Sequence, residues 1–271
     1  MHAATRSTSS RSAFRFGRRN TTLAARRGGG RTALNVELLR VPSAGTELAV
    51  LRYEARRPRS VTIVAGHGYS SSKHNLDFLC GFLASHGFDI YSLDFPGHKL
   101  GASGGRLTSD AQLVEAMGAV VKHARQDSND TIYTMGHSMG AMTALRTAAA
   151  DSGVRGTIAI ATGYGRPSAL TALAGMSKND FRSSYVDGLT LPELIANTDT
   201  ALDDVLSQLA GRPALYIAAE RDMMVNNRSV RDLFDRAPEP KTFATIASDH
   251  TTAADNARSE VLAWLNGLHP R

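Results

Sequence analysis

Short apolar segments alternate with longer helical segments along most of this chain, and no other feature restricts its fold as strongly. Val61–Ala65 is typical, because most of its residues are β-branched and a glycine follows it. Such a segment predicts a strand that is buried on both faces. The other predicted strands are Leu34–Val41, Glu47–Tyr53, Asp89–Leu93, Thr131–Met135, Thr157–Ala161, Ala214–Ala218 and Thr242–Ile246. Short strands separated by helices predict a mostly parallel, eight-stranded sheet of the α/β class.

Apolar residues at helical spacing mark the segments between these strands. In residues 73–86, Leu76, Leu79 and Leu83 recur at intervals that place them on one side of a helix. The predicted helices are Lys73–His86, Thr108–Arg125, Met139–Ala150, Asn226–Phe234 and Ala253–Leu268. We expect them to cover both faces of the sheet, with the first two strands forming an antiparallel edge.

Residues 163–205 interrupt this alternation. They contain Pro167, Pro192 and scattered polar residues, with only short apolar stretches between them. We interpret the segment as an insertion that follows the sixth predicted strand.

Residues 1–31 differ in composition from the rest of the chain, since they hold eight arginines and no acidic residue. The whole sequence has a formal net charge of +6, yet the remaining residues carry 23 basic and 25 acidic side chains. Because that part is nearly neutral, we expect no nucleic-acid partner. We predict that 1–31 is a disordered extension and that 32–271 is the folded domain. We expect a cytoplasmic location. The extension also has the composition of a transit peptide, which makes organellar targeting the alternative.

Composition excludes other classes of protein. The sequence has no run of about 18 uncharged apolar residues, so stable membrane insertion is not expected. Cys80 is the one cysteine, which excludes an internal disulfide framework and a cysteine-built zinc site. Either a monomer or a homodimer is compatible with the sequence.

The pentapeptide Gly136–Gly140 lies between a predicted strand and a predicted helix. A serine on a sharp strand-to-helix turn needs small neighbours, and the two glycines around Ser138 meet that need. Such a turn would expose Ser138 at the carboxyl edge of the sheet, beside the positive end of a helix. The pattern predicts a nucleophilic serine, and the alternative is a serine that only caps the helix.

In this context the chain resembles the α/β-hydrolase superfamily over about residues 34–268. Within it, the closest resemblance is to small-capped serine hydrolases of the monoacylglycerol lipase, lysophospholipase and feruloyl esterase type. The motifs that carry the resemblance are His67-Gly68, Asp94-Phe95-Pro96-Gly97-His98, Gly136–Gly140, Asp222 and His250. It implies the α/β-hydrolase fold, with residues of about 163–205 as a small cap. It also implies hydrolysis of carboxylic esters, such as small to medium acyl esters or monoacylglycerol-like lipids, through an acyl-enzyme that needs no metal or organic cofactor.

The order expected for the catalytic groups in this superfamily is serine, acid, histidine. Two histidines follow Ser138 in the chain. His269 lies beyond the last predicted helix, where chains are usually loose, whereas His250 follows a strand and should reach the carboxyl edge. We therefore predict His250 as the base. Asp222, which also follows a strand, is predicted to orient His250, and Glu220 is the competing acid.

Two backbone amides are expected to hold the oxyanion of the tetrahedral intermediate. One belongs to Met139, the residue after the nucleophile. By resemblance to the His-Gly motif the other belongs to Tyr69, whose side chain can then line the substrate pocket, and His67 braces this loop. The residues expected to contact substrate are Tyr69, His137, Tyr164 and Met176.

The same three catalytic groups are compatible with other functions. A thioesterase or an acyltransferase of secondary metabolism would use the same triad. A binding protein on this fold is the non-catalytic alternative, but such proteins usually carry a damaged triad or oxyanion loop, and this sequence shows neither. The expected partner is therefore a small-molecule ester.

Overall fold

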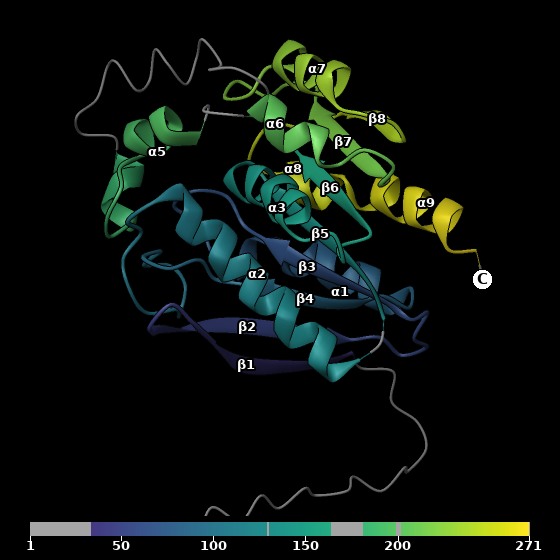
Figure 1. Ribbon diagram of the computed structural model, residues 1–271, viewed down its shortest axis with the longest axis horizontal. Coiled ribbons are helices and arrows are strands. Elements are labelled where there is room, and N and C mark those ends of the chain that lie inside the picture. The colour runs from purple at the N-terminus through teal and green to yellow at the C-terminus, as the bar shows by residue number, and fades with distance from the viewer. Residues whose placement is uncertain (1–33, 129, 164–180, 199–201, 271) are drawn as a thin grey trace, which may run out of the picture. The chain divides into compact units, whose positions relative to one another are not determined.

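The computed structural model describes residues 34–128, 130–163, 181–198 and 202–270, and in this part of the chain eight strands form one sheet (Figure 1). The strands are β1 (Asn35–Ser43), β2 (Thr46–Glu54), β3 (Val61–Gly66), β4 (Asp89–Leu93), β5 (Thr131–His137), β6 (Gly156–Ile160), β7 (Ala214–Ala219) and β8 (Lys241–Ile246). Their order is β1-β2-β4-β3-β5-β6-β7-β8. β2 pairs antiparallel with β1 and β4, and the other neighbours are parallel. The predicted sheet with its antiparallel edge is confirmed.

Helices cover both faces of this sheet (Figure 1). The described helices are η1 (Lys73–Leu76), α1 (Asp77–Ser85), α2 (Asp110–Asp127), α3 (Met139–Ala150), η2 (Phe181–Tyr185), α5 (Leu191–Thr198), α6 (Leu202–Ser207), α7 (Asn227–Arg236), α8 (Ala253–Asn256) and α9 (Arg258–Leu268). Apolar side chains of α2, α3, α6 and α7 pack with Val64 on one face, and those of α1, α8 and α9 pack with Ile63 on the other. Neighbouring strand residues point to opposite faces, so β3 contributes to both cores. Each large apolar side chain buried in this way stabilises the fold by roughly 1.5–3 kcal/mol.

Three local features differ from the expectation. The predicted helix 73–86 starts as the 3₁₀ helix η1 and continues as α1, and the predicted helix 253–268 is interrupted at Ala257 between α8 and α9. The end of the chain is also held in place, because a ring nitrogen of His269 lies 2.9 Å from the Tyr133 hydroxyl. The expectation of a loose His269 is therefore wrong.

The described parts of the predicted cap lie between β6 and β7 and comprise η2, α5 and the beginning of α6. Figure 1 shows α5 beside the start of α2, and the two helices are in contact. Two of the predicted substrate contacts, Tyr164 and Met176, lie outside the described residues, as does the predicted extension 1–31. No helix of the described chain is long and apolar enough to cross a membrane.

The parallel strands direct one edge of the sheet toward the candidate site. β3, β5, β6, β7 and β8 run in the same direction, so their carboxyl ends meet at one edge. Ligands of such sheets bind beyond this edge, in the loops that follow the strands.

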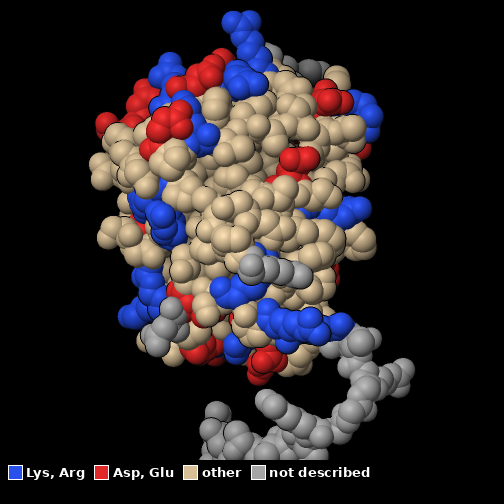
Figure 2. Space-filling view, turned by 90° about the vertical axis from the view of Figure 1, so that its right-hand side faces the viewer, with Lys and Arg blue, Asp and Glu red and all other residues tan. Residues whose placement is uncertain are grey.

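Away from the site, the face in Figure 2 carries basic and acidic side chains interspersed with uncharged surface. That mixture agrees with the nearly neutral charge balance outside residues 1–31.

Candidate active site

Ser138 lies on a strained turn between β5 and α3. Its backbone has φ 55° and ψ −117°, a conformation that non-glycine residues rarely adopt. A Cβ atom added to Gly136 would lie 2.1 Å from the Gly140 carbonyl oxygen, and one added to Gly140 would lie 2.1 Å from that of Gly66. The turn therefore tolerates no side chain at either glycine. The Ser138 side chain makes no capping hydrogen bond to α3.

Three predicted residues meet at this turn. The Nε2 atom of His250 lies 3.0 Å from the Ser138 Oγ, and its Nδ1 atom lies 2.7 Å from the Asp222 Oδ2. The other Asp222 oxygen accepts from the amides of Met224 and Val225, at 2.8 and 2.7 Å. Because a carboxylate can only accept, the Nδ1 atom of His250 donates to Asp222, which leaves Nε2 of a neutral imidazole as the acceptor for the Ser138 hydroxyl.

The competing acid Glu220 and the neighbouring Asp249 do not bond the imidazole. Glu220 is exposed, and in the described chain Asp222 is the carboxylate that bonds the His250 ring. The exposed Asp249 carboxylate instead accepts from the Thr252 amide at 2.9 Å, at the start of α8. The Asp249 carboxylate is therefore an acceptor for its own loop and not for the imidazole.

His137 borders the same cavity but also holds His250 from behind. Its Nε2 atom donates to the His250 carbonyl oxygen at 2.8 Å, and the two ring centroids are 4.8 Å apart. Burial, and secondarily the nearby His250, lowers the pKa of His137 to about 3. A neutral His137 therefore supports the backbone of His250, a contact that the expected role in substrate binding did not include.

The loop after β3 approaches the nucleophile closely enough to supply an amide donor. A Cβ atom added to Gly68 would lie 3.5 Å from the Ser138 Cβ. On the opposite side Met139 opens α3, where backbone N–H groups have no acceptor within the helix and the dipole is positive. The Tyr69 side chain turns toward the cap, and its hydroxyl donates to the Leu189 carbonyl at 2.9 Å.

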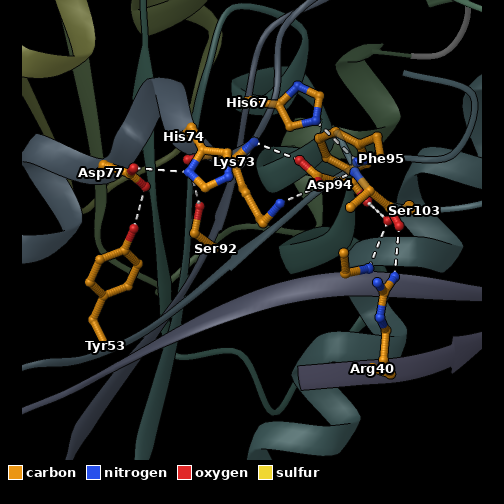
Figure 3. A network of polar contacts seen from close by, with 12 residues as sticks. Arg40, Tyr53, His67, Lys73, His74, Asp77, Ser92, Asp94, Phe95 and Ser103 are labelled. Atoms are coloured by element: carbon orange, nitrogen blue, oxygen red, sulfur yellow. Dashed lines mark hydrogen bonds and ion pairs between the residues drawn. The ribbon is translucent and has the colours of Figure 1, made fainter. Parts of the chain in front are cut away.

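A buried ion pair fixes the far end of this loop (Figure 3). The Lys73 amide donates to the Asp94 Oδ1 at 2.7 Å, and the Lys73 Nζ lies 2.6 Å from the Asp94 Oδ2, which also accepts from the Ala102 amide at 2.7 Å. Lys73 is 3% exposed and Asp94 is fully buried. Burial acts to raise the pKa of Asp94, but the hydrogen bonds from Lys73 and Ala102 outweigh it and lower that pKa.

His67 fixes the near end of the loop, and its partner is Phe95, the residue after Asp94. Its Nε2 atom accepts from the Phe95 amide at 3.0 Å, so its Nδ1 atom donates to the Gly68 carbonyl at 2.8 Å. Only the neutral ring can make both bonds, and burial, with His98 nearby, lowers the pKa of His67 to about 3. The Gly68 carbonyl and the Tyr69 N–H belong to one trans peptide and point in opposite directions. His67 therefore orients the amide that was predicted as an oxyanion donor.

A cavity of about 340 Å³ opens beside Ser138 and His250. Apolar side chains line much of it, and they come from α2, α3, α5 and the loop after β7. Among the described residues, no group of three or more histidine, cysteine, aspartate or glutamate side chains is arranged to hold a metal ion.

Comparison with known proteins places the chain in a family. Residues 57–207, more than half of the chain, match the family model described as serine aminopeptidase, S33. No curated protein matches the sequence. A solved esterase of Pyrococcus furiosus is 18% identical with a TM-score of 0.65, over 89% of this chain and 94% of the esterase.

Two other solved structures are similar to a comparable extent. A Butyrivibrio proteoclasticus protein with bound ferulic acid is 15% identical with a TM-score of 0.66, over 84% of this chain and 98% of that chain. A monoacylglycerol lipase of Paleococcus ferrophilus is 19% identical with a TM-score of 0.62, over 82% and 99%. At these identities the structures show the fold, while the family model shows the relationship. The chain belongs to the serine aminopeptidase, S33 family and has the α/β-hydrolase fold that its sequence predicts.

Proposed function

We propose that this protein hydrolyses carboxylic esters, with Ser138 as nucleophile, His250 as general base and Asp222 as the acid that orients it. The observation that carries the proposal is the pair of hydrogen bonds from Asp222 through His250 to Ser138, at the wall of a cavity. A serine hydroxyl is a weak nucleophile, and a base that a third group orients is the arrangement that activates it. The similarity to an esterase and to a monoacylglycerol lipase supports the ester class.

The reaction proceeds in two acyl transfers. His250 accepts the Ser138 proton through Nε2 while the Oγ attacks the ester carbonyl, and the amides of Met139 and Tyr69 donate to the resulting oxyanion. His250 then returns the proton to the leaving alcohol, and the acyl group stays on Ser138. Water, activated by the same imidazole, releases the acid and restores the serine. Each oxyanion donor of this kind is worth about 10²–10³-fold in kcat.

The described part of the cavity suits an ester better than the amino terminus of a peptide. An aminopeptidase must hold a charged α-amino group, which calls for an available carboxylate in the pocket. Among the described residues that line the cavity, Asp110 alone carries a carboxylate, and it is paired with Arg146. We therefore propose small to medium acyl esters and monoacylglycerol-like lipids, rather than peptides, as the substrates. Tyr69 and His137 are among the residues that would contact them.

The test is the hydrolysis of p-nitrophenyl esters beside labelling with a fluorophosphonate. We expect Ser138→Ala to lose both turnover and labelling, because no other hydroxyl bonds the His250 ring in the described chain. Ser207→Ala, which changes an exposed serine of α6, is the matched control and should keep both. Turnover above about 1% of wild type in Ser138→Ala would contradict the nucleophile, given how much such changes cost. Labelling of Ser138 without turnover of any ester would contradict the substrate class.

A further inference from the structure

The cavity receives side chains from both sides of β5. In the sheet, β4 lies on one side of β5, and β7 and β8 lie on the other. The loops after β7 and β8 contribute Val225 and Thr251, beside His250. The helix after β4, α2, contributes Leu113 and Val114. An ester at the nucleophile therefore has two directions in which its two parts can extend.

The chemistry of the reaction assigns one direction to each part of the ester. His250 must return its proton to the leaving oxygen, so that oxygen lies within hydrogen-bond reach of the imidazole. The alcohol therefore leaves on the side of β7 and β8, where His250 stands. The acyl group stays bonded to Ser138 and extends the other way, toward α2 and α3.

One side of α3 borders this second direction. Four residues of the helix line the cavity, and counted from the first they stand at positions 0, 3, 4 and 7: Met139, Met142, Thr143 and Arg146. That spacing places them in one row along the helix. The Thr143 hydroxyl donates to the Met139 carbonyl at 2.9 Å, so its polar group is satisfied within α3. Before Arg146, the row therefore presents apolar side chains and one hydroxyl whose hydrogen bond is made within α3.

An ion pair ends this apolar path. Arg146 pairs with Asp110, the first residue of α2, and the two side chains are 20% and 18% exposed. An alkyl chain that stripped the remaining water from this pair would impose a desolvation cost. From Met139 to Arg146 the helix rises about 10 Å. An extended alkyl chain gains about 1.3 Å per carbon, from C–C bonds of about 1.5 Å, so the path holds about eight carbons.

We propose that α2, α3 and α5 form the acyl-binding channel of this enzyme and that the Arg146–Asp110 pair sets its length. The preferred substrates are then esters of medium-chain acids, with about eight acyl carbons or fewer. This inference rests on the proposed function. It makes Arg146 a specificity-determining residue about two helical turns from the nucleophile.

The test is a series of p-nitrophenyl esters from acetate to palmitate. In the wild type, kcat/KM should rise by up to about fourfold for each buried methylene and fall beyond octanoate. Arg146→Ala opens the far end of the channel, so its optimum should move to longer acyl chains. In this variant Asp110 keeps a donor, the Ala111 amide at 2.9 Å. Val114→Phe narrows the channel, so its optimum should move to shorter chains.

Arg125→Ala is the matched control. Arg125 also pairs with an aspartate, Asp151, at 2.7 Å, but it is not among the residues that line the cavity. Its chain-length profile should equal that of the wild type. In a second series with one acyl group and varied alcohols, Arg146→Ala should leave the order of preference unchanged.

The results separate the channel from the proposed function. An optimum at palmitate in the wild type, or an unchanged optimum in both channel variants, would overturn the channel while Ser138-dependent hydrolysis upheld the proposed function. If the wild type hydrolysed no ester in a Ser138-dependent way, the proposed function would fail, and the acyl channel with it.

Discussion

At the scale of single residues, the Asp222 carboxylate sets the tautomer of His250. One oxygen accepts from the His250 Nδ1 atom and the other from two backbone amides, so the carboxylate has little freedom to rotate. Asp222→Asn would place an amide donor near the ring and favour the wrong tautomer. We expect kcat for a p-nitrophenyl ester to fall about 10³–10⁴-fold. Glu220→Gln, which changes an exposed acid, should stay within about twofold. The opposite order of effects would transfer the orienting role to Glu220.

We predict that Lys73 is a positioning residue and that its effect appears in kcat. It holds the loop that carries the Tyr69 amide, and it neutralises the buried Asp94. Lys73→Met should lower kcat by about 10-fold to 10²-fold, with little change in KM. It should lower the affinity for a trifluoromethyl ketone by the same factor. It should also cost about 3–5 kcal/mol of the free energy of unfolding, because it leaves a buried charge unpaired.

A destabilised core variant separates this positioning effect from general loss of stability. Leu83→Ala removes a buried side chain of α1 that is not part of the loop, at a cost of about 2–5 kcal/mol. Assayed well below its melting temperature, it should keep the wild-type kcat and inhibitor affinity. Equal kcat values for Lys73→Met and Leu83→Ala would remove Lys73 from the positioning role.

Sequence patterns predicted some residues of the candidate site and not others, for physical reasons. Ser138 and His250 stand out because each follows a predicted strand in a position that exposes it at the sheet edge. Lys73 carries no such signal, since lysines at helix starts are usually solvated. Its burial depends on β3 and β4 being neighbours, which brings Asp94 beside it, and that adjacency comes from the strand order. The contact between His137 and the His250 backbone depends in the same way on tertiary structure.

At the scale of elements, the described base of the cap attaches to the loop between β4 and α2. The Asp187 amide donates to the Gly97 carbonyl at 2.8 Å, the Leu107 amide to Asp187 at 2.7 Å, and the Leu189 amide to Leu107 at 2.8 Å. Gly188 lies at the centre with φ 121°, and a Cβ atom there would lie 1.9 Å from the Leu107 carbonyl oxygen. The attachment therefore requires glycine at this position.

Gly188→Ala should loosen the cap more than it destabilises the domain. The backbone strain of alanine at positive φ costs about 1–2 kcal/mol. Gly211→Ala is the control, because Gly211 has φ 75° and open space around it, so this variant introduces the backbone strain without a steric clash. Both variants should therefore melt a few degrees lower. Only Gly188→Ala should raise KM for an octanoate ester severalfold, because α5 lines the cavity. An unchanged KM in Gly188→Ala would show that the attachment does not shape the site.

The alternation of strands and helices predicted the elements well and their interruptions poorly. Every predicted strand is present in the described chain with boundaries within about two residues. The break at Ala257 is invisible in the sequence, because apolar residues keep helical spacing on both sides of it. The strand order could not be predicted either, because the alternation of strands and helices indicates a parallel sheet but not which strands are neighbours.

At the scale of the whole molecule, three buried histidines link stability to pH. Burial is the main cause that lowers the pKa of His67 and His137 to about 3 and that of His98 to about 4. In the unfolded chain a histidine titrates near pH 6.5. Below that pH the unfolded state binds protons that the native state excludes, so the free energy of unfolding falls as pH falls. The loss begins near pH 6.5 and continues to about pH 4 for His98 and to about pH 3 for His67 and His137.

Urea unfolding from pH 7 to pH 4.5 would measure this linkage. Each excluded proton contributes a slope of about 1.4 kcal/mol per pH unit once the unfolded histidine is protonated. His98→Phe removes one such group. The ring is 1% exposed and its Nε2 atom has no hydrogen-bond partner among the described residues, while its Nδ1 atom lies 3.1 Å from the Pro96 carbonyl oxygen. Losing that contact and repacking the buried site lower stability at every pH, so the pH dependence is what the variant tests. The variant should therefore lose less stability between pH 6 and pH 4.5 than the wild type, by about one proton's slope. Parallel profiles for the two proteins would mean that His98 binds its proton as readily in the native state as in the unfolded chain.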